Sequence, residues 1–349
     1  MATEGVTAMR VGALVQPQSP GAIEFAQQAE ALGVASLWCP ETWGYDALTG
    51  LAWIAARTTS LQVGTFVVQL GSRSPALLAS SALSLQALSG GRFRLGIGVS
   101  GPGVMEGWHG VRFAKPVQTT RETIEIVRMV SRGERLEHPG EIYPLPLPDS
   151  RGKALVPAVE PAHVPIYVAA LGPKNLALTG ELADGWLGNA FVPEQAGLFL
   201  DPIAAGASRA GRTLAELDLV APVALEVAAD PADALRRGRR HADGYAFTIG
   251  AMGSGSTNFY NDAFTRLGFG TEVAEVARLW KEKRRDEAAA AVPLELGTLT
   301  NLVGTRDQIA ERVAQYRKTG ISTLLAKTAG TWDEQLALLR VLVEIVAQS

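Results

Sequence analysis

The sequence predicts an α/β fold in which eight parallel strands close into a (β/α)8 TIM barrel, with insertions on the loops of its C-terminal face. Short apolar runs alternate with helical patterns almost from end to end of the 349 residues. Eight such runs favour a closed barrel over an open doubly wound sheet. Glycines follow many of the helical patterns, as at Gly33 and Gly320, where a left-handed residue would end a helix. A single barrel domain over residues 1–349 fits this length.

The expected strands are the apolar runs between these helical patterns. In chain order they read RVGALV, SLWC, LQVGTFVV, FRLGIGV, IYVAA, GWLG, DLVAPVALEV and TLLAKT. Their repeated alternation with helices predicts that they pair in parallel. They occupy residues 10–15, 36–39, 61–68, 93–99, 166–170, 185–188, 218–227 and 323–328.

The expected helices lie between these strands. Several begin near a proline, as at Pro75, and several end before a glycine, which are ordinary helix start and stop signals. They occupy residues 21–32, 51–57, 75–88, 117–131, 174–182, 194–209, 306–319 and 332–347.

Two stretches interrupt the alternation. Residues 134–164, approximately, are rich in proline and contain HPGEIYPLPLP. Residues 242–293, approximately, contain IGAMGSG, NFYND and the charged run KEKRRDEAAAA. Both mix aromatic or aliphatic residues with turn formers, unlike a flexible linker. We therefore expect two insertions on barrel loops that serve as lids or subunit contacts.

Composition excludes several classes of function. The net charge is −3, from 32 basic and 35 acidic residues, so we expect no nucleic-acid partner and no membrane surface. The single Cys39 and the absence of a signal-like apolar segment favour a cytoplasmic protein. Its four histidines lack HxH or HExxH spacing, so we expect no metal site. The sequence has no GxSxG elbow and no P-loop. Gly96, Gly98 and Gly101 have the GxGxxG spacing, but a long loop follows them instead of a helix, so we do not interpret them as a dinucleotide fingerprint.

The most informative segment is SGGRFRLGIGVSG, which ends at Gly101. Alternating glycines at the end of a strand let the backbone approach a flat ligand, because no Cβ is in the way. Strand ends at residues 63–69 and 166–172 share this layout. In a barrel, the loops at the carboxyl ends of the strands build the active site. We therefore expect the three ends to form one rim around a small-molecule or cofactor pocket.

The loop after the second strand places a carboxylate, a hydroxyl and two aromatic rings together, which suits a planar heterocycle. Alternatively, its aromatic rings would only cap the barrel while its acids face solvent or cap a helix. The residues concerned are Glu41, Thr42, Trp43, Tyr45 and Asp46.

The next two strands add candidates to the same mouth. Phe66, Val67 and Gln69 end the third strand, although the same pattern suits a plain buried strand and turn. After the fourth strand, Gly98, Val99, Ser100 and Gly101 lead into MEGWHG, which contains Glu106, Trp108 and His109. A histidine beside a tryptophan and a carboxylate can donate a proton in a dry pocket. A structural plug for the loop is an equal alternative.

The fifth strand leads to the expected start of a helix at Gly172 and Pro173. Free N–H groups there, together with Lys174, favour an anion such as a phosphate. The plain alternative is a turn from strand to helix. Ala170 and Leu171 precede this turn, and the sixth strand offers Trp186 and Asn189 to the rim.

With these segments in view, the chain resembles the luciferase-like monooxygenase superfamily. Within that superfamily it is similar to the oxidoreductases that use the deazaflavin coenzyme F420, such as methylenetetrahydromethanopterin reductase. The resemblance spans nearly the whole chain. It rests on ALGVASLWCPETWGYDALT, VGTFVVQLGSRSPALLA, LSGGRFRLGIGVSGPGVMEGWHG and PIYVAALGPKNLALTGELADGW, in this order.

The resemblance implies a bacterial luciferase-like barrel with the cofactor across its C-terminal mouth. It implies a cis peptide between Phe66 and Val67 that backs the cofactor ring, and a homodimer formed through barrel helices. It also implies that Gly172 and Pro173 contact the cofactor phosphate. The other cofactor-binding residues implied are Glu41, Thr42, Gln69, Gly98, Val99, Ser100, Gly101, Ala170, Leu171 and Lys174.

The resemblance has two departures. Relatives that act on a sugar phosphate carry Asp-His where this chain has Glu41 and Thr42, so their substrate does not transfer. They also carry an acid soon after the fourth-strand glycines, where this chain has Gly101 and reaches Glu106 only later.

We expect an F420-dependent oxidoreductase that moves a hydride between the deazaflavin C5 and a small organic substrate. His109 and Glu41 are the candidates for acid–base work. An FMN-dependent monooxygenase that uses reduced flavin and oxygen is the alternative. A third possibility is a barrel without chemistry that carries a cofactor or serves in an assembly. The candidate substrate-side residues are Trp43, Tyr45, Glu106, Trp108 and Asn189.

Overall fold

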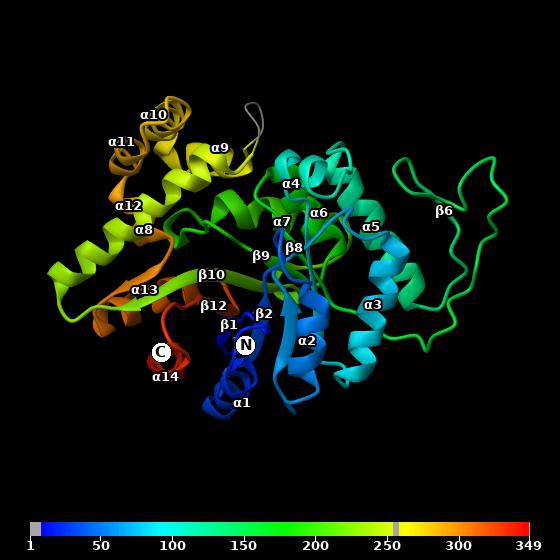
Figure 1. Cartoon of the computed structure of the whole chain (residues 1–349), viewed down its shortest axis with the longest axis horizontal. Coiled ribbons are helices and arrows are strands. Elements are labelled where there is room, and N and C mark those ends of the chain that lie inside the picture. Colours follow the sequence, from blue (N-terminus) through cyan, green and yellow to red (C-terminus); the bar gives the residue numbers. More distant parts are fainter. Residues whose placement is uncertain (1–7, 254–257, 349) are drawn as a thin grey trace.

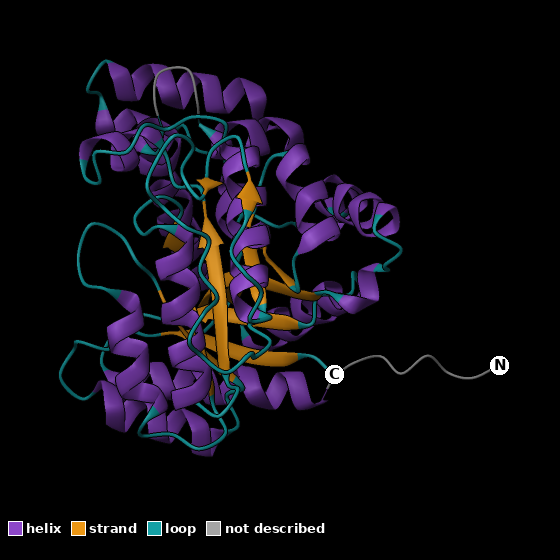
Figure 2. Cartoon of the chain, turned by 90° about the vertical axis from the view of Figure 1, so that its right-hand side faces the viewer, coloured by secondary structure: helices purple, strands orange, loops and turns teal. Residues whose placement is uncertain are grey.

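The computed structural model describes residues 8–253 and 258–348. Eight parallel strands form a closed barrel, because β12 pairs with β1 on one side and with β10 on the other, and β10 also pairs with β9. The predicted (β/α)8 barrel is therefore confirmed (Figures 1 and 2). The barrel strands are β1 (Arg10–Leu14), β2 (Ser36–Cys39), β3 (Gln62–Thr65), β5 (Phe93–Gly98), β8 (Ile166–Ala169), β9 (Gly185–Leu187), β10 (Asp218–Val227) and β12 (Thr323–Lys327).

Helices surround the strands, as Figure 2 shows. Several begin at the signals that the sequence carries: the side chain of Ser74 accepts the Leu77 N–H, and Thr305 caps its helix in the same way. These helices are α1 (Ala22–Leu32), α2 (Ala47–Ala55), α3 (Pro75–Leu88), α5 (Pro116–Ser131), α6 (Pro173–Leu182), α7 (Gly197–Arg209), α13 (Arg306–Lys318) and α14 (Trp332–Gln348).

Two predicted elements have different bounds. The strand expected over residues 61–68 breaks after β3, and the chain resumes as β4 (Val68–Gln69), which pairs with β5. A cis peptide between Phe66 and Val67 lies at the break, as the resemblance implied. The helix expected to start at residue 51 begins at Ala47, because the Asp46 side chain accepts the Thr49 N–H at 2.6 Å and caps it.

The first interruption of the alternation lies between α5 and β8. It is a helix-to-strand connection, which in a (β/α)8 barrel belongs to the N-terminal face, so the prediction that this insertion lies on the C-terminal face is wrong. Its antiparallel hairpin, β6 (His138–Pro139) with β7 (Pro144–Leu145), stands away from the barrel (Figure 1). The Glu122 carboxylate on α5 holds this segment by accepting backbone N–H groups of residues 141–143, and these hydrogen bonds lower its pKa. The segment is therefore anchored to the barrel wall through its backbone.

The second interruption lies between β10 and β12 and is longer than the expected residues 242–293. It begins at Pro231, because residues 231–251 form one amphipathic helix whose start the composition did not reveal. Residues 254–257 of the expected insertion lie outside the described residues. The segment contains α8 (Pro231–Ala251), α9 (Phe259–Phe264), the kinked turn η3 (Thr265–Phe269), α10 (Gly270–Lys281), α11 (Arg285–Ala290), α12 (Leu294–Leu299) and β11 (Leu302–Gly304).

Three short helices complete the chain. One of them, α4, lies within the loop after β5 and above the strands in Figure 1. No helix among residues 8–253 and 258–348 is long and apolar enough to cross a membrane. The three are α4 (Pro102–Gly107) and the 3-10 helices η1 (Pro193–Gln195) and η2 (Leu214–Glu216).

The barrel interior is filled by large side chains from several strands. Trp38 on β2 and Tyr167 on β8 meet edge to face with centroids 5.2 Å apart, across strands that are not neighbours. The Tyr167 hydroxyl donates to Asp218, the first residue of β10, at 2.8 Å. Leu187, Val220 and Leu325 complete this interior cluster. The residues that pack on this cluster from the carboxyl ends of their strands are only partly buried, so the C-terminal end of the barrel is the more open one. They are Leu14, Phe66, Val67 and Ala169.

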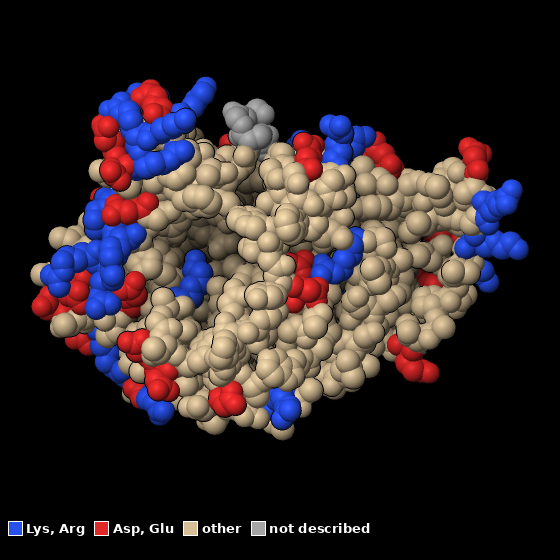
Figure 3. Space-filling model, viewed as in Figure 1, with Lys and Arg blue, Asp and Glu red and all other residues tan. Residues whose placement is uncertain are grey.

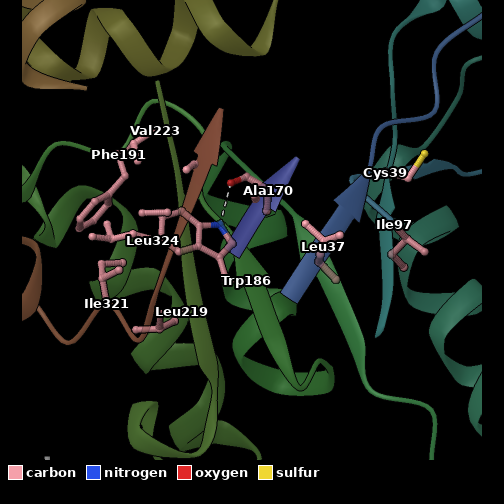
Figure 4. Close-up of a cluster of buried hydrophobic side chains, with 14 of the residues drawn as sticks. Leu37, Cys39, Ile97, Ala170, Trp186, Phe191, Leu219, Val223, Ile321 and Leu324 are labelled. Atoms are coloured by element: carbon pink, nitrogen blue, oxygen red, sulfur yellow. Dashed lines mark hydrogen bonds between the residues drawn. The ribbon is translucent and has the colours of Figure 1, made fainter. Parts of the chain in front are cut away.

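A second apolar layer lies between the strands and the helices (Figure 4). The prediction that Trp186 lies on the rim is wrong. Its side chain is fully buried in this outer layer, packs against Phe191 and Phe199, and donates its N–H to the Ala170 carbonyl at 3.0 Å. The reason is strand alternation: Leu187 faces the barrel interior, so its neighbour Trp186 faces outwards.

Candidate functional site

The ends of three strands meet at one edge of the site, as predicted. Gln69 on β4 pairs with Gly98 on β5, and Gly98 pairs in turn with Ala169 on β8. The segment after β8, with Ala170 and Leu171, therefore continues directly beside the loop that follows β5. The three strand ends form one continuous rim.

The glycines of β5 have a packing role that the sequence did not reveal. A Cβ on Gly96 would lie 1.9 Å from the Thr65 carbonyl oxygen, and one on Gly98 would lie 2.7 Å from the Val67 side chain. Both glycines thus make room for the bulge between β3 and β4. In contrast, a Cβ on Gly101 would meet nothing within 4 Å, so open space lies over the loop that follows β5.

Glu41 lies in an ion cluster with Arg73, a residue that the sequence did not single out. Arg73 donates to both carboxylate oxygens of Glu41, at 2.8 and 2.9 Å, and also pairs with Asp46. The Ala47 N–H adds a further hydrogen bond to Glu41 at 3.1 Å, and the Glu41 side chain is only 7% exposed. With both oxygens engaged, Glu41 anchors its loop. This arrangement leaves it poorly placed for the acid–base work that we expected.

The same ion cluster orders the start of α2. The cluster also shifts the pKa values of its members. The Glu41 and Asp46 carboxylates raise the pKa of Arg73. Burial would raise the pKa of Asp46, but hydrogen bonds from Thr49 and Arg73 outweigh it and lower this pKa. Asp46 also caps α2, so the loop after β2 is held at both ends.

His109 contacts Gln69, and this pair joins two of the predicted loops. The Gln69 amide nitrogen donates to the Glu41 backbone carbonyl at 3.3 Å, which leaves its oxygen 2.5 Å from His109 Nε2. An amide oxygen only accepts, so Nε2 carries the proton of the neutral imidazole. The other ring nitrogen, Nδ1, has no hydrogen-bond partner among the described residues. His109 is therefore able to accept a proton at Nδ1.

The aromatic candidates are largely exposed. Trp43 is 54% exposed, Tyr45 73% and Trp108 62%, and Thr42 is also exposed. Large exposed rings beside an open barrel mouth are typical of a ligand-binding surface. The loops that carry them flank the Gln69 and His109 pair.

Three further candidates lie on or near this rim. Glu106 turns back on its own loop, where it accepts the Phe113 N–H at 3.1 Å, so it supports the loop conformation. Val99 and Ser100 are half-buried, and Ser100 has a left-handed φ of 58°. Asn189, directly after β9, is half-buried.

The start of α6 is an uncapped helix N-terminus. Gly172 occupies the capping position without a side-chain hydrogen bond, and a Cβ there would meet nothing within 4 Å. Lys174, in the first turn, is exposed. Arg266 of the second insertion donates to the Leu171 carbonyl at 2.5 Å, and burial lowers its pKa. Two cations beside free N–H groups suit an anion, and Arg266 was missed by sequence reasoning.

A cavity of about 350 Å³ opens at the other side of the mouth, between the ends of β10 and β12 and helix α8. Figure 3 shows a hollow in this face of the molecule, with charged side chains gathered over α8, α10 and α11. The cavity is lined by Lys327, the last residue of β12, which the sequence did not single out. A lysine that ends an otherwise apolar strand, TLLAK, is the signal that was available. Among residues 8–253 and 258–348, no group of three or more metal-ligating side chains is assembled.

The chain is similar to known proteins over most of its length. The chain is 39% identical over 320 residues to a Mycobacterium tuberculosis protein provisionally named a coenzyme F420-dependent oxidoreductase, covering 89% of this chain and 91% of that protein. It is 28% identical to 5,10-methylenetetrahydromethanopterin reductase of Archaeoglobus fulgidus, covering 86% and 87% of the two chains.

Among solved structures, the coenzyme F420-dependent tetrahydromethanopterin reductase of Methanopyrus kandleri superposes with a TM-score of 0.78 at 20% identity, over 97% of this chain and 99% of that one. This similarity shows the same fold. The family model described as luciferase-like monooxygenase matches residues 5–323. The chain therefore belongs to the luciferase-like monooxygenase family.

Proposed function

We propose that this protein is a coenzyme F420-dependent oxidoreductase that transfers a hydride between the deazaflavin C5 and a small organic substrate. The observation that carries the proposal is the 39% identity, over 89% of the chain, to a protein provisionally named for that cofactor and activity. Three features of the described residues support it. The start of α6 suits the cofactor phosphate, the rim between Gly101 and Gly172 leaves room for a ligand, and His109 is able to exchange a proton.

The residues present fit such a cofactor. The uncapped start of α6, with Arg266 beside it, suits a phosphate group. Open space over the backbone of Gly101 and of Gly172 leaves room for a ligand along the rim between them. Gln69, Gly98 and Ala170 would lie along one side of that ligand, with Phe66 and Val67 behind it.

When bound, the deazaflavin would supply the carbon that accepts or gives up the hydride. The chain itself would hold the substrate and manage one proton. His109 would take that proton at Nδ1 when an alcohol is oxidised, or return it when a carbonyl is reduced, because Nε2 is committed to Gln69. Trp43, Tyr45 and Trp108 would close over the substrate and reduce its contact with water.

The proposal includes a homodimer of cytoplasmic subunits. Exposed apolar side chains on neighbouring helices support a subunit contact: Trp53 on α2 is 50% exposed, and Leu77 on α3 is 56% exposed.

The function is tested by label transfer. Reduced F420 that carries deuterium at C5 is mixed anaerobically with the protein and a panel of enones, imines and ketones, and products are analysed by mass spectrometry. The proposal predicts a product that contains one deuterium from C5. Turnover that requires oxygen and reduced FMN, with no transfer from F420, would reject it.

A further inference from the structure

The cavity beside β12 contains a lysine that faces the barrel interior. Leu325, two residues before Lys327, belongs to the interior cluster, and side chains two apart on a strand share a face. Lys327 pairs in register with Ala224 on β10, and both residues line the cavity. Lys327 therefore lies in the layer above the interior cluster, at the C-terminal mouth.

No carboxylate neutralises this lysine. Among the described residues, none lies within ion-pair distance of its Nζ, and burial alone lowers its pKa to about 8. Glu226 lines the same cavity, but its carboxylate is already engaged by Arg237 at 2.8 Å, Arg240 at 2.9 Å and His241 at 2.7 Å. The cavity thus carries an unmatched positive charge.

Most polar groups around Lys327 already have hydrogen-bond partners, with one exception. The Tyr245 hydroxyl pairs with Thr300 at 2.8 Å, and Asn301 accepts the Ala224 N–H at 2.8 Å. The Thr248 hydroxyl on α8 also lines the cavity and has no hydrogen-bond partner among the described residues. One cation and one free hydroxyl donor face the same space.

We propose that this cavity binds a carboxylate group of the substrate, with Lys327 as its counter-ion and Thr248 as a hydrogen-bond donor. A single ammonium matches the single negative charge of a carboxylate, and a charge buried without a partner is a cost that a bound counter-ion removes. The inference rests on the proposed function, because it places the reactive part of the substrate towards the Gln69 and His109 side of the same mouth.

The test uses the full chain without cofactor and two matched probes, butanoate and its neutral analogue butanamide, with binding measured by calorimetry at pH 7. Wild type should bind butanoate in preference to butanamide. Lys327→Met should weaken butanoate binding about tenfold or more, the size expected for a charged hydrogen bond in a pocket. Lys327→Arg should retain part of the affinity, since it keeps the charge. Lys318→Met, which removes an exposed lysine of α13, is the matched control and should bind like wild type.

Equal affinity of wild type and Lys327→Met for butanoate would overturn the proposal, as would equal affinity of wild type for butanoate and butanamide. Failure of wild type to bind butanoate would also overturn it. Titrating the same proteins with F420 tests the proposed function separately from the carboxylate site. Loss of F420 binding in every protein would count against the function and leave the carboxylate result standing.

Discussion

His109 Nε2 lies 2.5 Å from the side-chain oxygen of Gln69, and this contact decides which ring nitrogen of His109 is free to exchange a proton. The Gln69 amide nitrogen is committed to the Glu41 carbonyl at 3.3 Å, so the amide cannot present its N–H to the imidazole. Gln69 comes from the strand end after the bulge and His109 from the loop after α4. The pair therefore also ties together two loops of the proposed site.

Replacing His109 by alanine should lower kcat by about 10²- to 10⁴-fold, the usual contribution of general acid–base catalysis. The affinity for F420 should change little, because the imidazole holds a proton and not the cofactor phosphate. Steady-state kinetics and fluorescence titration of F420 measure the two effects separately. An unchanged turnover rate would remove His109 from the mechanism.

Replacing Gln69 by leucine should lower kcat by about tenfold, a smaller effect than loss of the base itself. The physical reason is that the imidazole is no longer held in the Nε2–H tautomer, so the pH dependence of kcat should shift as well. Leucine has nearly the volume of glutamine, so a general loss of packing should not follow. A variant with wild-type kcat and pH profile would show that the contact has no positioning role.

Replacing Arg73 by glutamine should lower the free energy of unfolding by about 2 kcal/mol, because it leaves the nearly buried Glu41 carboxylate without its cation. The double variant Glu41→Gln, Arg73→Gln should recover part of this loss, since the unpaired charge is removed as well. Chemical denaturation measures both. If the single and double variants are equally unstable, Glu41 and Arg73 are not coupled as the geometry indicates.

Replacing Gly172 by aspartate should weaken F420 binding by tenfold or more while the fold is kept. The new carboxylate would cap α6 and repel the phosphate proposed to lie there. The matched variant Gly172→Ala should bind F420 as wild type does, because the backbone φ of −79° suits alanine and its Cβ meets open space. Unchanged F420 affinity in the aspartate variant would place the phosphate elsewhere.

Replacing Lys327 by methionine should make the protein more stable at pH 7, by about 3 kcal/mol. Burial lowers the pKa of Lys327 from 10.5 to about 8, so the folded state loses this proton before the unfolded state does. Between pH 8 and 10.5 the unfolded state binds more protons, and the stability of wild type should therefore rise with pH. The variant should lack this rise. Denaturation curves at pH 7, 9 and 10.5 provide the comparison, and parallel pH dependence in both proteins would contradict the account.

The barrel could be predicted from the sequence because each strand is a separate apolar run between helix signals. The strand over residues 61–68 was predicted to be too long, because the apolar run continues through the break after Thr65. Trp186 was assigned to the rim because sequence position alone does not tell which face of a strand points inwards. The long α8 was missed in part because its glycines and charged residues obscure its apolar face.

The loops of the candidate site could be located because they follow strand ends, but the contacts between them could not. Glu41, Gln69 and His109 were each named, yet nothing in the sequence shows that they join into one network. Arg73 and Lys327 were missed because their roles depend on distances between segments far apart in the chain. Charge pairing and burial are properties of the folded chain.

The measurement that tests the central claim most directly is a titration of the cofactor-free protein with F420 and, separately, with FMN. Our account predicts saturable binding of F420 and much weaker binding of FMN. Selective, tight binding of FMN, with no measurable binding of F420, would contradict it.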